Sequence, residues 1–308
     1  MSETNESTVD NGGDNGDAEV VRRDEFDIDG VLELDITLGS GRVAVNLVDK
    51  PGARVELRHD PHDANPFAQS LSSLMTWIGG QFGGAEQQEA SPADAVRQSR
   101  IDLTGTRLVV RTPTSLALRG VPISVTIEAP AGSHINVRAG SANVTTSGEA
   151  GRLDLSTATG DVTTASATGV ATVRTGSGTI RLGEMTRGLR ARSGSGDVDV
   201  AAVGGTTSVG TGTGGIWFGA VDGDVMVRTG SGDVTIASAR AGQIDMTTGS
   251  GRIRVGVKAG TRAEVDLSSG AGTARSELDL SDTPPTEEPG LRVRGRTGSG
   301  SAVITRAS

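Results

Sequence analysis

The sequence predicts an all-β chain, a parallel two-sheet β-solenoid with 18-residue coils and two short strands per coil. Three observations predict this fold: a strict glycine period, paired runs of alternating apolar residues, and a scarcity of large side chains. The phrase Thr-Gly-Ser-Gly and its close variants recur every 18 residues, with last glycines at Gly160, Gly178, Gly196, Gly214 and Gly232. A period of this kind indicates similar units stacked along one direction.

The alternating runs give each coil its two strands. Counted from the marking glycine as position 1, apolar residues recur at positions 3 and 5 and often at position 8, as in Val198, Val200 and Val203. A second glycine near mid-repeat is followed by another alternating pair, such as Val225 with Val227. One such strand pair cannot bury its apolar side alone, so we expect successive coils to stack into two facing sheets.

Composition indicates that the core between these sheets is narrow. Glycine accounts for 46 of 308 residues, aromatic residues for 2%, and Tyr and Cys are absent. Aromatic side chains are the largest fillers of wide globular cores. Val, Ile, Leu and Ala in their place fit a thin core repeated in every coil.

The domain organisation follows from where the pattern starts and stops. Residues 1–24 are acidic and without periodicity, and we predict a disordered tail there. The solenoid domain is predicted over residues 25–308, with a helical insertion at about 60–100 and a polar loop at about 281–290. Looser steps to Gly251, Gly272 and Gly300 continue the series of marking glycines, and a last strand pair follows the polar loop.

Charge narrows the range of partners. The net charge is −9, and residues 1–35 hold twelve acids against two arginines, so the rest of the chain is close to neutral. No broad basic surface for DNA or RNA is therefore expected. The N-terminal residues lack the basic and apolar regions of a signal peptide, and no run reaches the length of a membrane span. We expect a cytoplasmic protein without membrane contact, while a surface location stays open.

Metal-dependent folding is weighed because calcium-binding β-rolls also use 18 residues per turn. Here an acid follows the marking glycine at Asp161, Asp197 and Asp233, but other coils hold Thr179 or Arg252 at the same place. Calcium requires six to eight oxygen ligands, several of them charged. We predict no metal site, no cofactor and no catalytic set.

The chain resembles a bacterial putative-adhesin family of β-strand-repeat proteins, a domain of unknown function related in pattern to autotransporter-adhesin heads. The resemblance rests on residues 121–127 (Val-Pro-Ile-Ser-Val-Thr-Ile), residues 130–132 (Pro-Ala-Gly), residues 135–137 (Ile-Asn-Val) and the repeated Thr-Gly-Ser-Gly-Asp-Val phrase. It covers roughly residues 30–306. The resemblance implies a β-solenoid with an interaction role and brings no catalytic residues.

The insertion holds the strongest signal outside the repeats. Apolar residues recur there at helical spacing, bordered by one tryptophan: Phe67, Leu71, Leu74, Met75, Trp77 and Ile78. Ser91 and Pro92 suit the N-cap and first turn of a second, short helix. The apolar face either caps an open solenoid end or docks a partner. Membrane binding is the weakest alternative, since residues 64–96 contain no Lys or Arg.

Two further features lie on the predicted sheets. Alternation places Trp217 outward between inward Ile216 and Phe218, where it could stack on a sugar, anchor a partner or be an ordinary exposed residue. Arg192 with Asp197, and Arg228 with Asp233, are expected to face each other across a corner as a solvated salt-bridge ladder.

The function predicted from these observations is a non-enzymatic interaction scaffold that acts through its sheet faces, its inserted helix or its ends. A protein partner or self-association is expected. The alternative is a glycan-binding or glycan-cleaving solenoid that uses the exposed face around Trp217.

Overall fold

The fold is described from a computed structural model of the whole chain, covering residues 5–11, 20–60, 91–115, 117–278 and 289–307. The chain divides into two compact units, residues 1–146 and residues 147–308. The long strand β8 (His134–Ala150) carries the chain from the first into the second, and each unit is described by itself.

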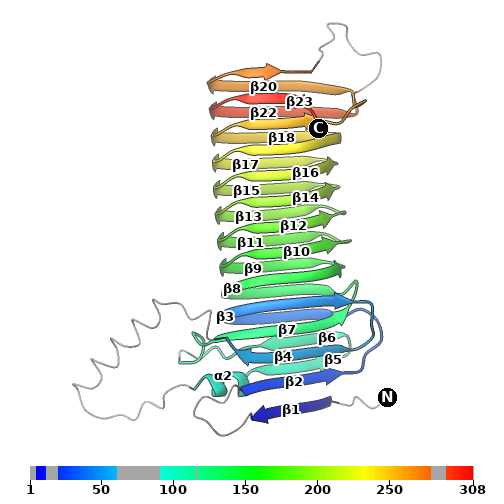
Figure 1. Cartoon of the computed structure of the whole chain (residues 1–308), viewed down its shortest axis with the longest axis vertical. Helices are drawn as coiled ribbons and strands as arrows, with labels where there is room; N and C mark the ends of the chain where they lie inside the picture. The colour runs from blue at the N-terminus through cyan, green and yellow to red at the C-terminus, as the bar shows by residue number, and fades with distance from the viewer. Residues whose placement is uncertain (1–4, 12–19, 61–90, 116, 279–288, 308) are drawn as a thin grey trace, which may run out of the picture. The chain divides into compact units, whose positions relative to one another are not determined.

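Unit 2 is a stack of parallel coils in which the two sheets run in opposite directions (Figure 1). Sheet A contains β10 (Val162–Ala167), β12 (Ile180–Met185), β14 (Val198–Gly204), β16 (Ile216–Asp222), the first part of β18 (Val234–Ser250), β19 (Ile253–Val257), β21 (Ala274–Ser276) and β23 (Ala302–Arg306). Sheet B contains β9 (Leu153–Thr159), β11 (Ala171–Ser177), β13 (Leu189–Ser195), β15 (Thr207–Thr213), β17 (Val225–Ser231), the second part of β18, β20 (Ala263–Ala271) and β22 (Leu291–Ser299). The predicted parallel two-sheet solenoid is confirmed.

The core of unit 2 is the narrow apolar interior that the repeat predicts. Val198, Val200 and Val203 are all buried, as are Val225 and Val227 on the facing sheet. From β9 to β17 each residue pairs with its equivalent 18 residues away, for example Val198 with Ile216 and Val200 with Phe218. The coil that contains β18 has one extra residue, so Val225 pairs with Ile244. The regular registers from β9 to β17 therefore place inward side chains above their equivalents in the coil before.

The coils do not stack in the order of the sequence at the C-terminal end. Strand β22 pairs with β18 on one side and with β20 on the other, and β23 lies in the same way between β19 and β21 (Figure 1). The marking glycines are stacked in the order Gly251, Gly300, Gly272. A Cβ added to Gly300 would meet the carbonyl of Gly251, and a Cβ added to Gly272 would meet the carbonyl of Gly300. The last strand pair is thus inserted between two coils that precede it in the chain.

Unit 1 combines parallel coils with antiparallel strands. In it, β3 (Glu33–Val48) pairs in parallel with β6 (Arg107–Arg111) along its first part and with β7 (Pro122–Pro130) along its second. Strand β4 (Ala53–His59) returns as an antiparallel neighbour of β7, and β5 (Arg100–Thr104) forms an antiparallel pair with β6. Its core includes Leu34, Ile36, Val55 and Val125.

The acidic N-terminal segment contains two strands where the sequence predicts a disordered tail. Strand β1 (Asn5–Asn11) pairs antiparallel with β2 (Val20–Phe26), which in turn pairs antiparallel with β4. Burial of Val20 and Phe26 gives β2 an apolar side. Two of its charges are paired across the strands, since Arg23 lies 2.9 Å from Glu56 and Glu25 lies 2.7 Å from Arg54. The prediction of disorder is therefore wrong for the residues in these strands.

The insertion is described only in part. The predicted helix with Phe67, Leu71, Leu74, Met75, Trp77 and Ile78 falls in residues 61–90, outside the described residues. The second predicted helix is confirmed as α2 (Pro92–Arg97), whose N-cap Ser91 accepts a hydrogen bond of 3.3 Å from the Ala93 amide. Its buried residues, Ala95 and Val96, face β2 and β4. No helix within the described ranges is long and apolar enough to cross a membrane.

Candidate binding face of unit 2

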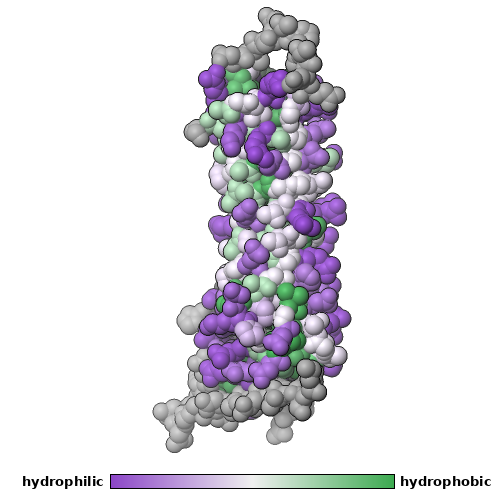
Figure 2. All heavy atoms as spheres, turned by 90° about the vertical axis from the view of Figure 1, so that its right-hand side faces the viewer, coloured by the Kyte–Doolittle hydropathy of each residue, from purple (hydrophilic) through white to green (hydrophobic). Residues whose placement is uncertain are grey.

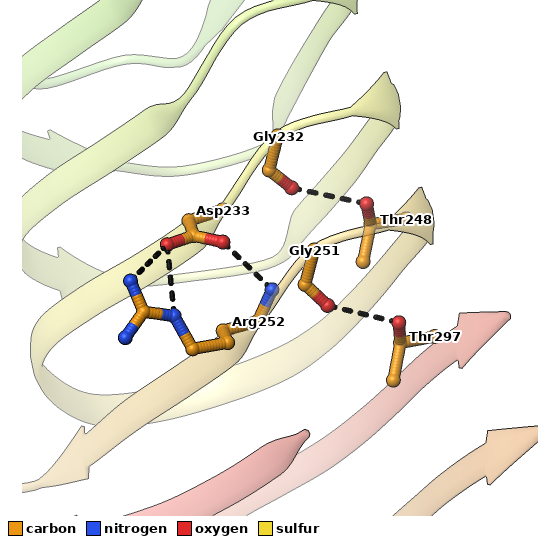
Figure 3. A network of polar contacts seen from close by, with 6 residues as sticks. All are labelled: Gly232, Asp233, Thr248, Gly251, Arg252 and Thr297. Atoms are coloured by element: carbon orange, nitrogen blue, oxygen red, sulfur yellow. Dashed lines mark hydrogen bonds and ion pairs between the residues drawn. The ribbon is translucent and has the colours of Figure 1, made fainter. Parts of the chain in front are cut away.

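The corners that follow sheet B are fixed by backbone contacts between coils (Figure 3). The buried threonine of the Thr-Gly-Ser-Gly phrase donates to the carbonyl of the preceding marking glycine, from Thr248 to Gly232 at 3.0 Å and from Thr297 to Gly251 at 2.9 Å. At Gly232, φ is +152° and an added Cβ would lie 1.9 Å from the Gly214 carbonyl oxygen. The glycine and threonine of this phrase are therefore structural residues.

The acids at these corners bind the next coil rather than the arginines of their own corner. Asp197 Oδ1 accepts from the Gly215 amide at 2.7 Å, and Asp233 Oδ1 accepts from the Arg252 amide at 2.8 Å. The Arg252 guanidinium also contacts Asp233 at 2.8 Å (Figure 3). The predicted pairs Arg192–Asp197 and Arg228–Asp233 are wrong, because each aspartate is held by the coil stacked on it.

The pKa of Asp233 is lowered below its ordinary value by these contacts. The largest cause is the hydrogen bond from the Arg252 backbone amide, and the next largest is burial, which acts in the opposite direction. The side-chain hydrogen bond and positive charge of Arg252 add to the effect, with a smaller contribution from Arg254. This carboxylate is consequently ionised and occupied in the stack, and is not available as a free acid or base.

The outward side of sheet B carries a column of exposed arginines. Along the stack, Arg174 pairs with Arg192, and Arg192 pairs with Gly210 of the next coil. Gly210 pairs in turn with Arg228, and Thr247 lies between Arg228 and Arg296. Neighbouring coils lie about 4.8 Å apart, so these four arginines occupy one column of outward positions along the stack. Within the described part of the chain, none of these four arginines has an ion pair. Arg190, also exposed, lies on β13 in the adjacent outward position.

Two further columns run beside the arginine column. The first consists of the exposed glycines that open the Gly-Ser-Gly part of each phrase, such as Gly176, Gly194 and Gly212. The second is the hydroxyl column at the corner, which holds Ser177, Ser195, Thr213, Ser231 and Ser250. An added Cβ on Gly194 would lie 2.5 Å from the Gly176 carbonyl oxygen, so side chains are excluded from the glycine column. The result is a strip of bare backbone between arginines and hydroxyls.

Trp217 lies on the opposite side of the unit, on sheet A. It is 42% exposed, which agrees with the outward position that alternation predicts. Its neighbours in the register are Asp199 and Thr235. The Trp217 Cη2 atom lies 3.1 Å from the position of an added Cβ on Gly219, so the indole ring lies along its own strand over that glycine. A flat, half-exposed aromatic surface results.

Other exposed apolar residues are isolated. Val170 is 53% exposed and lies in a turn, and Met226 is 45% exposed on sheet B. Figure 2 shows the side of the molecule at the right of Figure 1, where apolar surface is confined to small patches among polar residues. Single exposed apolar side chains of this kind are common on soluble proteins. Among the described residues, no three His, Cys, Asp or Glu side chains are grouped so that they could hold a metal ion.

Sequence reasoning found the individual arginines but not the face they build. It assigned Arg192 and Arg228 to corner ion pairs, and it treated the body of the chain as neutral. The available signal was their common spacing, since Arg174, Arg192 and Arg228 all occupy the position before a Thr-Gly-Ser-Gly phrase or its variant. Trp217 does not lie on this face, and the predicted apolar residues of 61–90 fall outside the described residues.

Comparison with solved structures gives remote likenesses at low identity. A putative adhesin from Bacteroides fragilis is 11% identical with a TM-score of 0.39, covering 92% of this chain and 96% of that one. A putative adhesin from Parabacteroides distasonis is also 11% identical with a TM-score of 0.31, covering 93% and 94%. A putative cell adhesion protein from Clostridium sporogenes is 7% identical with a TM-score of 0.24, covering 93% and 99%.

The search of curated proteins returned no match. The family comparison is more informative, because the model described as Toastrack DUF4097 matches residues 120–305. This range includes every coil of unit 2 from β9 to β23 and all of the outward columns on sheets A and B. Since the match spans more than half of the sequence, the chain belongs to the Toastrack DUF4097 family.

Proposed function

We propose that this protein is a non-enzymatic interaction scaffold that binds its partner through the outward sheet faces of unit 2. The observation that carries the proposal is the separation of roles within each coil. Inward side chains build the core and corner side chains fix the stack, as Val200 and Thr248 do. The outward arginine column of sheet B does neither, yet it holds chemically similar groups in successive coils, as Arg174 and Arg192 show.

A rigid repeating face of this kind suits recognition of an extended or repetitive partner. Parallel coils hold outward side chains at a fixed spacing of about 4.8 Å, so several weak contacts can form at once without ordering a loop. Contacts distributed along a sheet favour binding over chemistry at a single point.

The proposal is tested by adhesion of beads coated with the full-length protein. The beads are presented to surfaces bearing neutral polysaccharide, acidic polysaccharide or an unrelated protein, with EDTA present. Saturable adhesion to one surface, with the ligand recovered chemically unchanged, is the expected result. Adhesion to none of the three, or cleavage of the polysaccharide, would contradict a non-enzymatic scaffold.

A second candidate is glycan binding on the Trp217 face, favoured by the indole ring lying flat over Gly219. Aromatic faces stack on the apolar side of sugar rings. Trp217→Ala is then expected to abolish adhesion to neutral polysaccharide and to leave the melting temperature within a few degrees, because the ring is partly exposed. Met226→Ala is the matched control, since it removes a similarly exposed apolar side chain from the other sheet. Equal adhesion of both variants and the wild type would exclude this site.

A further inference from the structure

We infer that the outward face of sheet B is a binding site for a linear acidic polysaccharide. The inference rests on the proposed scaffold function and specifies its ligand. The polymer would lie along the glycine column, with its carboxylates or sulfates toward the arginines and its hydroxyls toward the corner serines and threonines. Three features of the face support this assignment: its charge, its shape and its lack of aromatic residues.

Charge is the first feature. In β9, β11, β13, β15 and β17, Asp154 is the only acid, whereas Arg174, Arg190, Arg192 and Arg228 are all exposed. Arg174 and Arg192 occupy directly paired positions in adjacent strands, where like charges repel. An anionic ligand relieves this repulsion, and the guanidinium group suits a carboxylate or sulfate because it donates two parallel hydrogen bonds.

The contrast with the end of the stack shows that unpaired arginines are not general in this protein. On β22, Arg292 lies 3.3 Å from Glu264, and Arg294 lies 3.4 Å from Asp266 and 3.7 Å from Asp245. These acids occupy the neighbouring strands at the same register. The arginines of β11, β13 and β17 have no acid at the paired positions, which hold Thr, Ser, Gly or another Arg, so their charge is left for a ligand.

Shape is the second feature. The glycine column leaves a strip without side chains beside the arginines, bounded on its far side by the hydroxyls of Ser195, Thr213 and Ser231. Hydroxyls at the edge can exchange hydrogen bonds with sugar hydroxyls, and exposed backbone in the strip permits close approach. One coil advances by about 4.8 Å, which is comparable to the length of one sugar ring in an extended chain.

The absence of aromatic residues distinguishes the ligand from a nucleic acid. Single-stranded DNA and RNA are usually held by bases stacked on aromatic side chains. The outward positions of β9, β11, β13, β15 and β17 contain no Phe, Tyr, Trp or His. A carbohydrate polymer with acidic groups satisfies the arginines and hydroxyls together and requires no stacking platform.

The loss-of-function test uses a fluorescein-labelled oligogalacturonide and fluorescence anisotropy with the full-length protein. The double variant Arg192→Gln/Arg228→Gln is expected to bind at least about tenfold more weakly than the wild type, since two charge-assisted contacts are lost. Arg181→Gln/Arg254→Gln is the matched control, because it removes the same charge from exposed residues of sheet A. Its affinity should stay within about twofold, and added salt should weaken binding of the wild type.

The gain-of-function test fills the gap in the column. Gly210 pairs with both Arg192 and Arg228, has no positive φ, and an added Cβ there would meet the nearest atom at 3.6 Å. Gly210→Arg is therefore expected to fold normally and to bind the oligogalacturonide several-fold more tightly. Thr235→Arg adds the same charge to sheet A at an outward position and should not change the affinity.

The outcomes separate this inference from the broader function. Equal weakening by the sheet B and sheet A double variants would overturn the site, since it would show attraction by net charge alone. Tighter, arginine-dependent binding of single-stranded DNA would overturn the ligand class. If the beads adhere to neutral polysaccharide or protein while the labelled oligogalacturonide fails to bind, this inference fails and the scaffold function stands.

Discussion

At the residue scale, the corners show which contacts the sequence can and cannot predict. The pairing of Thr and Ser hydroxyls with corner carbonyls was predictable, because a Thr or Ser stands three residues before each marking glycine and can reach the corner backbone. The partner of Asp233 was not, because Arg252 is 19 residues away and becomes its neighbour only when the coils stack. Arg228 is closer to Asp233 along the chain and was the predicted partner, but its side chain points outward on sheet B.

The lowered pKa of Asp233 gives a pH-dependent contribution to stability. A carboxyl whose pKa is lower in the folded than in the unfolded chain stabilises the fold above the ordinary Asp value of about 3.9, and this contribution disappears as the pH falls below it. Asp233→Asn keeps an acceptor for the Arg252 amide but removes the charge. At pH 6 we expect it to lower the free energy of unfolding by less than about 1 kcal/mol, because the pair is partly exposed. The melting temperature should fall slightly as a result.

The measurement is the melting temperature of the wild type and Asp233→Asn between pH 2 and pH 6. The difference between the two proteins should narrow as the pH falls below the ordinary Asp value of about 3.9. A difference that widens as the pH falls would contradict the lowered pKa.

At the element scale, the insertion of β22 between β18 and β20 has an electrostatic explanation. If β20 stacked directly on β18 in the register that β22 defines, Asp266 would lie opposite Asp245. Strand β22 instead places Arg294 between them and Arg292 beside Glu264. The sequence could not reveal this order, since Gly272 and Gly300 both continue the glycine series and the deciding charges are far apart in the chain.

Reversal of the central charge tests this explanation. Arg294→Glu would place three carboxylates in one row with Asp245 and Asp266, and we expect a loss of roughly 1–2 kcal/mol and faster hydrogen exchange in β22. Arg296→Glu is the control on the same strand, because its neighbours in the register are Thr247 and Ser268. It should cost less than about 0.5 kcal/mol. Equal losses in the two variants would show that the ion pairs do not hold the inserted strand.

At the scale of the whole molecule, the sequence predicted those parts of the fold that repeat. The coils of unit 2 were predictable because each repeat contains the same pattern of inward residues and turns. The antiparallel strands β1, β2, β4 and β5 of unit 1 carry no repeated phrase, so their pairing depends on distant partners that local patterns do not specify. The arginine column was missed for a related reason, since a near-neutral total hides charges that only the register brings together.

The modular character of unit 2 predicts that one whole coil can be removed. Each coil contacts only its neighbours, so deletion of residues 197–214 joins Gly196 to Gly215 and lets Ile216 take the position of Val198 without changing any register. We expect a folded protein with the circular dichroism spectrum of the wild type and one cooperative melting transition at a moderately lower temperature. Deletion of residues 197–205 removes only half a coil and would feed the sheet B strand β15 into sheet A. Thr207 and Val209 would take the inward places of Val198 and Val200, but Gly212 would replace buried Val203, and every later coil would be half a turn out of phase with the coils before it. That shorter deletion should abolish the cooperative transition, and comparable melting of the two deletion variants would show that the coil is not the folding unit of this protein.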